Sequence, residues 1–405
     1  MNGRNEAVKQ HDDGQVAAPA VRRRSLGRTG IAVSEIGLGC EHLQGQNAQT
    51  VFSVVDAALA AGINLMDVFM SEPQVRSDIG AALKGRRDTA VIQGHIGSVW
   101  RDGQYTRSRD LAECQRAFED LLCRLGTDYI DVGMLHFVDT QEDYRRVFDS
   151  PLVQYAQDLK RQGVIRAIGM SSHDPVAALR AVQTGLIDVL LFSLNPAYDL
   201  LPEDTVIDDL FAEETYRKGE LRGINPARAR LYQACEAAGT AITVMKGLGA
   251  GTLLRAQSSP FGAALTPVQC VHYALTRPAV ASVLVGCRTP EEVKQAVAYE
   301  QAGDDEKDYS LVLAGTPKYS MTGRCMYCNH CLPCPAHIDI AQVNKYLDLA
   351  QELEGASVPP TVQEHYLALE HTAQECLACG SCEGNCPFGV QVISRMEQAA
   401  QLFGK

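Results

Sequence analysis

Eight cysteines stand in two short runs near the end of the chain, and their spacing constrains the fold more than any other feature. The first run advances in steps of three residues and ends in Cys-Pro, and the second ends in Cys-x3-Cys-Pro. Four soft thiolates at this spacing are typical ligands of a 4Fe–4S cluster, because one loop can then wrap a face of the cluster. The runs are Cys325, Cys328, Cys331 and Cys334, and then Cys376, Cys379, Cys382 and Cys386.

Two runs of this type predict two 4Fe–4S clusters, with the fourth cysteine of each run completing the other cluster. A pair of structural zinc sites is the alternative. Zinc sites usually use two separated Cys-x2-Cys pairs rather than three cysteines in steps of three, so the spacing favours the clusters. The predicted ligand sets are Cys325, Cys328, Cys331 and Cys386 for one cluster, and Cys376, Cys379, Cys382 and Cys334 for the other.

Composition excludes several classes of protein. Of the 405 residues, 46% are hydrophobic and 21% are charged, which is typical of a folded chain with a sizeable core. No apolar run is long enough to span a membrane. The net charge of −12 argues against nucleic acid as a partner, because phosphate binding needs clustered Lys and Arg. Residues 1–21 are polar and lack a signal-peptide core, so we expect a disordered tail and a cytoplasmic, reducing location.

Short apolar runs alternate with amphipathic stretches from about residue 33 to residue 300. The runs are almost continuously apolar, as parallel strands buried on both faces are. Eight repeats of strand and helix predict the α/β class and a closed (β/α)8 TIM barrel. An open doubly wound sheet is the alternative, but no Gly-x-Gly-x-x-Gly follows a strand. The candidate strands are 33–40, 63–70, 90–96, 129–137, 165–172, 188–195, 241–248 and 282–286.

Polar side chains follow nearly every candidate strand. Active sites of TIM barrels lie at the C-terminal ends of the strands, so these residues are expected to line a site. The acidic segment 196–223 is long enough to be a lid or a binding loop, and Trp100 is expected in the loop after the third strand. The strand-end residues are Cys40, Glu41, His42, Asp67, His95, His136, Ser172, His173, Asn195, Lys246, Cys287 and Arg288.

The remaining cysteines are expected to be packing residues. Four of them stand in helical patterns, where a small thiol usually belongs to the core. Cys40 and Cys287 end the first and last candidate strands, which are neighbours in a closed barrel. The four in helical patterns are Cys114, Cys123, Cys235 and Cys270.

Helical patterns at 340–355 and 361–374 separate the two cysteine runs. They predict a small α-helical, ferredoxin-like iron–sulfur domain behind the barrel. From Ser320 onward, 4 basic and 9 acidic residues give a net charge of −5. Such a surface favours docking of a redox partner, such as a ferredoxin or a reductase, although solubility alone explains it equally well. The expected units are the tail 1–21, the barrel 22–302, a linker 303–319 and the iron–sulfur domain 320–405.

Several of these segments resemble the aldo-keto reductases. RRRSLGRTGIAVSEIGLGC resembles the opening of that family, GINLMD its second strand, and LGTDYIDVGMLH the strand that ends in its catalytic His. VIRAIGMSSH, VMKGLGAG and VLVGCRTPEEVKQAV resemble the later strands that hold its nicotinamide cofactor. The resemblance covers about residues 22–300. It implies the eight-stranded barrel and NADPH-dependent carbonyl reduction by a tetrad of Asp, Tyr, Lys and His.

The tetrad carries over only in part. Asp67 and His136 match the family Asp and His, no Tyr stands at the family position after Asp67, and His95 replaces the Lys. The resemblance therefore implies Asp67, His95 and His136 as catalytic residues. With its cysteine-rich tail, the chain resembles the ferredoxin-fused aldo-keto reductase-like oxidoreductases. The residues that the resemblance assigns to NADP(H) are Ser172, His173, Asn195, Lys246, Gly286 and Arg288.

Three functions compete at this point. The first is an iron–sulfur oxidoreductase that reduces a small carbonyl or hydroxyl compound at the barrel mouth with electrons from the two clusters. The altered tetrad suggests a specific reaction for this oxidoreductase, which is reductive dehydroxylation through a ketyl radical. The second is an NADPH-dependent carbonyl reductase, with His95 in place of the Lys and Tyr105 or Tyr198 as the acid. The third is a non-catalytic electron-transfer or docking protein.

Overall fold

The computed structural model describes residues 21–200, 224–314, 323, 325–329, 331–351 and 358–404. The expected tail therefore lies outside the described residues except for Val21, which is buried. Residues 201–223 of the expected lid segment also lie outside them. In the described part of the chain, no helix has the length and apolar character needed to cross a membrane.

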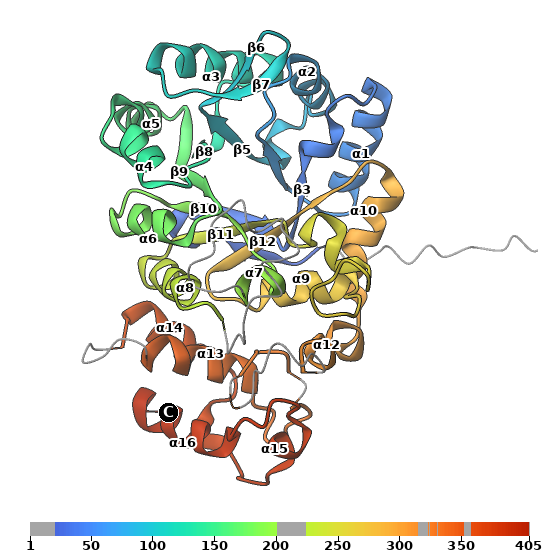
Figure 1. Cartoon of the computed structure of the whole chain (residues 1–405), viewed down its shortest axis with the longest axis vertical. Coiled ribbons are helices and arrows are strands. Elements are labelled where there is room, and N and C mark those ends of the chain that lie inside the picture. Colours follow the sequence, from blue (N-terminus) through green and yellow to red (C-terminus); the bar gives the residue numbers. More distant parts are fainter. Residues whose placement is uncertain are drawn as a thin grey trace, which may run out of the picture.

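Eight parallel strands form a closed barrel, which confirms the predicted (β/α)8 architecture (Figure 1). The first strand is shorter than expected, because residues 32–34 pair elsewhere, in a small antiparallel ribbon. The barrel strands in order are β3 (Ile36–Gly39), β4 (Leu65–Val68), β5 (Val91–Ile96), β8 (Ile130–Leu135), β9 (Ile165–Ser172), β10 (Val189–Ser193), β11 (Ala241–Met245) and β12 (Val280–Gly286).

The antiparallel ribbon closes one end of the barrel. It consists of β1 (Arg23–Ser25) and β2 (Ala32–Ser34). Leu26, Ile31 and Val33 are buried in one apolar cluster with side chains of the barrel interior. The interior is thus a packed core, and the carboxyl ends of the strands remain as the functional end.

The surrounding helices follow from cap and periodicity signals. In α3, the Asp110 side chain accepts a hydrogen bond from the Glu113 backbone N–H (2.8 Å), and Gly126 ends the helix at φ 62°. Its buried residues recur at helical spacing and face the strands. The barrel helices are α1 (Ala48–Ala60), α2 (Pro73–Ala82), α3 (Leu111–Leu125), α4 (Gln141–Phe148), α5 (Pro151–Arg161), α6 (Pro175–Gln183), α7 (Pro196–Asp199), α8 (Pro226–Ala238), α9 (Pro267–Leu275) and α10 (Pro290–Val297).

A β-hairpin follows β5 where only a loop was expected. Its strands are β6 (Ser98–Arg101), which contains Trp100, and β7 (Gln104–Arg107). The two-residue turn is Asp102-Gly103, with φ values of 53° and 77°. An Asp-Gly pair is the strongest short-range signal for such a turn, because both positions require positive φ. That signal is present in the sequence and was missed.

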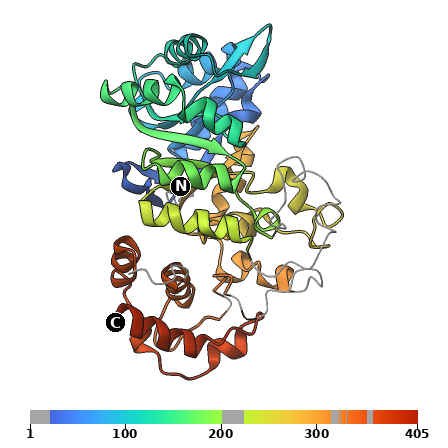
Figure 2. The ribbon, with the colours of Figure 1, turned by 60° about the vertical axis from the view of Figure 1, so that its left-hand side comes forward.

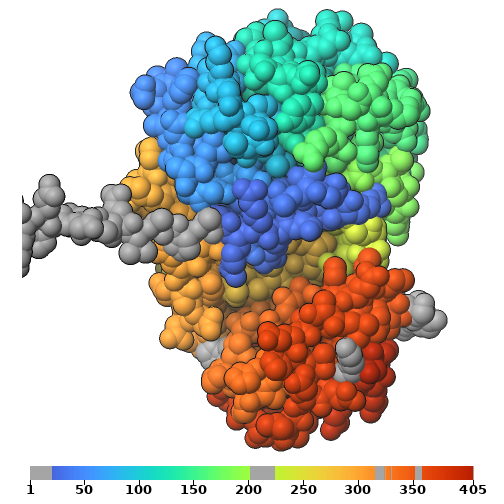
Figure 3. Space-filling model, turned by 180° about the vertical axis from the view of Figure 1, so that it is seen from behind, coloured from blue at the N-terminus to red at the C-terminus, as the bar shows by residue number. Residues whose placement is uncertain are grey.

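The cysteine-rich tail packs against the outer wall of the barrel (Figures 1 to 3). Helix α14 contacts α8, where Thr361 Oγ1 donates to the Glu236 carbonyl (3.3 Å) and His365 Nδ1 bonds Glu236 Oε1 (2.7 Å). Residues 315–319 of the expected linker lie outside the described part, and its earlier part contains α11 and α12. The helices here are α11 (Asp304–Lys307), α12 (Ser310–Ala314), α13 (Ile340–Gln351), α14 (Pro360–Leu367), α15 (Ser381–Asn385) and α16 (Val392–Phe403).

Candidate active site and cysteine cavities

Asp67, His95 and His136 meet at the carboxyl end of the barrel. Asp67 pairs in register with Gln93 on the next strand, and His95 lies two residues further on the same face. His136 directly follows β8. His95 Nε2 lies 3.0 Å from Asp67 Oδ1, and His95 Nδ1 lies 2.8 Å from His136 Nδ1. All three side chains are buried, so the strand ends bring the three predicted catalytic residues into one hydrogen-bonded group.

Two polar residues inside the barrel hold Asp67 in place. Gln93 Nε2 donates to Asp67 Oδ1 at 2.8 Å, and Thr243 Oγ1 donates to Gln93 Oε1 at 2.9 Å. Both residues are fully buried, and buried polar groups are retained where they are hydrogen-bonded. Neither residue was predicted as part of the site, although a Gln inside the apolar run VIQGHI was a visible signal.

A phenol reaches the same group from the hairpin. Tyr105, on β7, places its hydroxyl 2.6 Å from His136 Nε2. Of the two tyrosines considered as substitutes for the missing one, Tyr105 is therefore the one bonded to the group formed by Asp67, His95 and His136. Tyr198 lies in α7, where its backbone N–H donates to Asn195 Oδ1 at 2.9 Å.

The hairpin is fixed to the segment that follows β4, the strand that carries Asp67. Ser71 Oγ donates to the Val99 carbonyl at 2.7 Å, and Ser98 Oγ donates to the Phe69 carbonyl. The Phe69 ring also stacks on His136, with centroids 5.9 Å apart. These contacts set the position of Tyr105 without a tyrosine on the segment after Asp67.

One assignment of protons satisfies the whole chain of hydrogen bonds. Burial lowers the pKa of His136 well below its ordinary value, so this ring is neutral near pH 7. Tyr105 O–H then donates to His136 Nε2, and His136 Nδ1–H donates to His95 Nδ1. The His95 Nε2–H donates to the Asp67 carboxylate. The geometry thus links a half-buried phenol to a buried carboxylate through two imidazoles.

Two of the residues assigned to the cofactor belong to a separate polar group. His173 Nδ1 lies 2.9 Å from Asp139 Oδ2, and Ser172 Oγ donates to the Val138 carbonyl at 2.7 Å. Ser172 is fully buried. Its hydroxyl therefore supports the backbone after β8.

The other assigned residues lie at the ends of β10, β11 and β12. Asn195 Nδ2 donates to the Lys246 carbonyl at 2.9 Å, which joins two strand ends. Gly286 ends β12, and a Cβ added there would come within 2.3 Å of His42. Arg288 is exposed, and within the described ranges no side-chain hydrogen bond or ion pair connects it to Asp67, His95 or His136.

Two small cavities in the tail are each lined by four cysteines. The four cysteines around each cavity are the same four that the sequence predicts as the ligands of one cluster. Seven of the eight lie in loops of the two runs, and only Cys382 lies in a helix, α15. The donor sets, four sulfurs around each cavity, fit the 4Fe–4S group. Cys325, Cys328, Cys331 and Cys386 line one cavity, and Cys334, Cys376, Cys379 and Cys382 line the other.

The backbones of the two runs repeat each other. In both, the residue before the second cysteine, the residue after it and the third residue after the fourth have left-handed φ values. The repeat indicates that both runs curve around their cavities in the same way. The matched positions are Tyr327 (56°) and Ala378 (50°), Asn329 (59°) and Gly380 (79°), and His337 (56°) and Gly389 (62°).

The described cysteines are not arranged as in a zinc site. Across the ranges that the structure describes, no three His, Cys, Asp or Glu side chains are close enough together to hold one metal ion. A zinc site needs its sulfurs about 2.3 Å from a common centre, whereas a cluster spreads them around a larger body. One expectation for the other cysteines was wrong: Cys123 is exposed, because it lies on the outer side of α3, while Cys114, Cys235 and Cys270 are buried.

Comparison with known proteins agrees with this geometry. The model of the aldo/keto reductase family matches residues 35–264. The chain belongs to the aldo/keto reductase family. A second model, the 4Fe–4S dicluster domain, matches residues 324–391. The chain is therefore an aldo/keto reductase-family oxidoreductase with a C-terminal 4Fe–4S dicluster domain.

Three proteins that are similar to this chain each match part of it. An uncharacterized oxidoreductase of Bacillus subtilis, YqkF, is 27% identical over 68% of this chain and 90% of its own length. The NADH-specific methylglyoxal reductase of Escherichia coli is 27% identical over 42% of this chain and 58% of its own length. The holo form of an aldo-keto reductase from Bacillus halodurans shares the fold, with a TM-score of 0.54 and 22% identity over 71% of this chain and 94% of its own.

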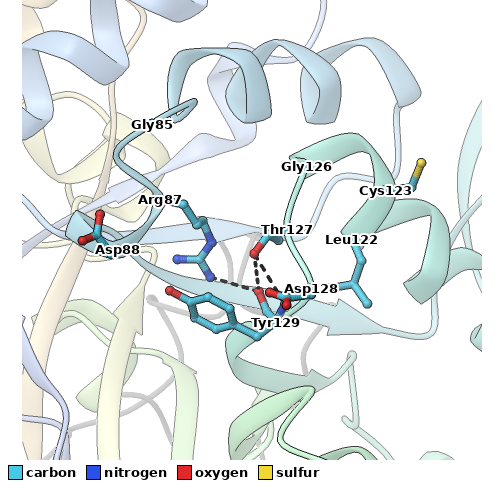
Figure 4. Close-up of a pocket in the computed structure, with 9 residues that line it drawn as sticks. All are labelled: Gly85, Arg87, Asp88, Leu122, Cys123, Gly126, Thr127, Asp128 and Tyr129. Atoms are coloured by element: carbon cyan, nitrogen blue, oxygen red, sulfur yellow. Dashed lines mark hydrogen bonds between the residues drawn. The ribbon is translucent and has the colours of Figure 1, made fainter.

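An open depression on this family member lies away from the active site (Figure 4). It is formed by the loops before β5 and β8, at the amino ends of the strands, whereas Asp67 and His95 lie toward the carboxyl ends. Arg87, its main cation, already pairs with Asp131 (2.9 Å) and stacks on Tyr129 (4.3 Å). The depression is therefore part of the stabilising end of the barrel.

Proposed function

We propose that this oxidoreductase reduces a small carbonyl or hydroxyl compound at the barrel mouth, with electrons delivered singly and protons delivered through Tyr105. The observation that carries the proposal is the unbroken series of hydrogen bonds from Tyr105 through His136 and His95 to Asp67. Such a series replaces the Tyr and Lys that are missing from the family pattern and supplies a proton donor facing the mouth. We keep a cytoplasmic, reducing setting as part of the proposal.

The series can hold and move one extra proton. When His95 carries it, paired with Asp67, His95 Nδ1–H donates to His136 Nδ1, and His136 Nε2–H donates to the Tyr105 oxygen. The Tyr105 O–H is then free to donate to the substrate oxygen. Once Tyr105 transfers its proton, each neighbour passes one proton along, and the series returns to its resting arrangement. Burial raises the pKa of Tyr105, which keeps the phenol protonated until it acts.

The cysteine cavities support two 4Fe–4S clusters as the electron source. Cys325, Cys328, Cys331 and Cys386 would hold one, and Cys376, Cys379, Cys382 and Cys334 the other. When bound, such clusters supply electrons one at a time. An external ferredoxin or reductase would replenish them.

Single electrons fit reductive dehydroxylation of a ketone that carries a neighbouring hydroxyl group. One electron makes a ketyl radical, whose oxygen accepts the hydrogen bond from Tyr105. The neighbouring C–O bond then breaks, and the departing hydroxide takes a proton and leaves as water. A second electron and a second proton complete the deoxygenated ketone. Two electrons and two protons are consumed for each water released.

Hydride reduction is the second candidate, because Tyr105 also restores a phenol beside the family His. In this case NADP(H), the usual cofactor of the family, would transfer a hydride to the carbonyl carbon while Tyr105 protonates its oxygen. The NADH-specific methylglyoxal reductase among the relatives fits this candidate. Ser172, His173, Asn195, Lys246, Gly286 and Arg288 remain its proposed cofactor residues.

Dihydroxyacetone distinguishes the two candidates in one experiment. Protein purified without oxygen is incubated with this ketone and either dithionite or NADPH, and the products are identified by NMR. Electrons delivered singly give hydroxyacetone and water, whereas hydride transfer gives glycerol. We expect hydroxyacetone in the dithionite reaction. Glycerol formed with NADPH alone would overturn the leading proposal and support the second. If neither hydroxyacetone nor glycerol forms, α-hydroxy ketones of this size are excluded as substrates.

A further inference from the structure

The barrel contributes a buried guanidinium to the cysteine-rich tail. Arg277 follows α9 and is 1% exposed. Its Nη2 donates to the Met326 carbonyl at 2.6 Å, between Cys325 and Cys328. Tyr309 O–H donates to the same carbonyl at 2.6 Å. A cation from the barrel thus anchors the loop that carries two predicted cluster ligands.

No carboxylate of the described chain pairs directly with Arg277. Its other hydrogen bonds go to the Tyr273 carbonyl (3.2 Å), to Thr276 Oγ1 (3.0 Å) and to the Tyr309 hydroxyl (3.1 Å). Nη1 is buried without a hydrogen-bond partner among the described residues. A buried charge without a counter-charge is strongly unfavourable, so an anion is expected beside Arg277.

The two tyrosines that flank Arg277 bind carboxylates that are already paired with other arginines. The Arg277 guanidinium stacks between the rings of Tyr273 (4.3 Å) and Tyr327 (4.9 Å). The hydroxyls of these rings donate to two carboxylates, Asp199 and Asp348, at 2.7 Å each. Asp199 pairs with Arg228 and Asp348 pairs with Arg395. Each of these carboxylates thus has an arginine of its own, and Arg277 reaches them only through the flanking tyrosines.

We propose that Arg277 is the buried counter-charge of the cluster held by Cys325, Cys328, Cys331 and Cys386, and that it raises the reduction potential of this cluster. A cluster with four thiolates is an anion, and net charge is one determinant of its potential. Reduction adds one electron to the cluster and neither makes nor breaks a bond. A nearby cation stabilises the more negative, reduced form, and low local polarity strengthens the effect.

Arg277 reaches the first cavity through Met326, which lines it, whereas among the described residues no hydrogen bond joins an arginine or lysine side chain to a residue that lines the second. The residues that line it are the cysteines and apolar side chains, and Cys379 is exposed to solvent. Arg277 should therefore affect one cluster and leave the other unchanged. This inference rests on the ligand assignment of the proposed function but not on the barrel chemistry, and iron and sulfide content tests that assignment separately.

The first experiment removes the charge. Full-length protein carrying Arg277→Gln is titrated with dithionite without oxygen, and the reduced clusters are followed by EPR. Cys379→Ala and Cys382→Ala together remove two ligands of the other cluster. The EPR signal that remains in this variant identifies the cluster held by Cys325, Cys328, Cys331 and Cys386. At the wild-type midpoint, we expect the ratio of reduced to oxidised cluster to fall about tenfold, equivalent to about 59 mV. Arg277→Lys keeps the charge and should restore most of the potential. Arg161→Gln is the matched control, because Arg161 is an exposed arginine at the end of α5.

A second pair of variants cancels the charge while Arg277 stays in place. Thr276→Asp puts a carboxylate where Thr276 Oγ1 now meets Nη2 at 3.0 Å, and Thr276→Asn has the same shape without the charge. The Asp variant should lower the potential of the same cluster, and the Asn variant should leave it near wild type. The proposal is overturned if iron-replete Thr276→Asp or Arg277→Gln keeps the wild-type potential. It is also overturned if both clusters shift equally, or if Thr276→Asp and Thr276→Asn behave alike.

Discussion

The barrel mouth and the cysteine-rich tail place their chemical groups by different means. At the mouth, Asp67 and His95 lie on strands paired on both sides, and His136 directly follows another such strand. In the tail, seven of the eight predicted ligands lie outside helices and strands, and only Cys382 lies in a helix, the five-residue α15.

Because of this difference, the two sites have different requirements for folding. The backbone ladder of the barrel fixes the mouth whether or not a substrate is bound. The cysteine loops hold Tyr327, Asn329, His337 and Ala378 at positive φ, which costs non-glycine residues roughly 1–2 kcal/mol each. Metal binding is the general means of offsetting such a cost in small metal domains. The tail should therefore depend on iron, and the barrel should not.

The largest expected effect comes from removing one cluster ligand. Cys328→Ala should lose about half of the bound iron and sulfide, because each set of four cysteines holds one of two equal clusters. Amides of α13 and α16 should then exchange hydrogen faster, while those of β5 and β8 keep their protection. Iron analysis and hydrogen-exchange mass spectrometry measure both effects.

Cys123→Ala is the matched control for that variant, because Cys123 is an exposed thiol on the barrel. It should leave iron content and exchange unchanged. Full iron retention in Cys328→Ala would contradict the ligand assignment. Loss of protection in β5 together with the tail would contradict the independence of the barrel.

A smaller effect, confined to the rate, is expected at the mouth. Tyr105→Phe removes the outer donor of the hydrogen-bonded series and should lower turnover of the dihydroxyacetone probe about 10²–10⁴-fold, the range typical of a lost proton donor. Iron content and reduction potentials should not change. Tyr198→Phe is the comparison, since Tyr198 was the other tyrosine considered. If Tyr198→Phe reduces the rate and Tyr105→Phe does not, the donor has been assigned to the wrong tyrosine.

The sequence predicted the parts of the molecule that depend on repeating patterns. Continuous apolar runs placed the eight strands, and strand ends then placed Asp67, His95 and His136 together. The contacts of Tyr105 were not predictable in the same way. Its approach to His136 depends on the Asp102-Gly103 turn and on side-chain bonds from a different strand. These are contacts between segments far apart in the chain, and no periodicity encodes them.

The smallest expected effect concerns the contact between the two regions. The hydrogen bond to Glu236 raises the pKa of His365 above its ordinary value of about 6.5. A raised pKa in the folded state stabilises the contact fully below the unfolded value and less as pH rises through the folded value. His365 is 54% exposed, so water screens the pair, and the contribution should be about 0–1 kcal/mol. The docking of α14 on α8 should therefore be slightly weaker at pH 7.5 than at pH 6.

Hydrogen exchange of α14 amides at pH 6 and pH 7.5, corrected for intrinsic rates, measures this change against a His365→Gln variant. The half-buried Lys345 lies nearby, and burial lowers its pKa to about 8. Its linkage has the opposite sign, because a depressed lysine pKa makes stability rise with pH, but it operates above about pH 8 and so outside the chosen interval. In the wild-type protein, the α14 amides should be less protected from exchange at pH 7.5 than at pH 6. In His365→Gln, their protection should be the same at both pH values. Equal slopes would show that another group controls the contact, and the barrel and tail would then be docked by Arg277 and the apolar contacts rather than by this charge pair.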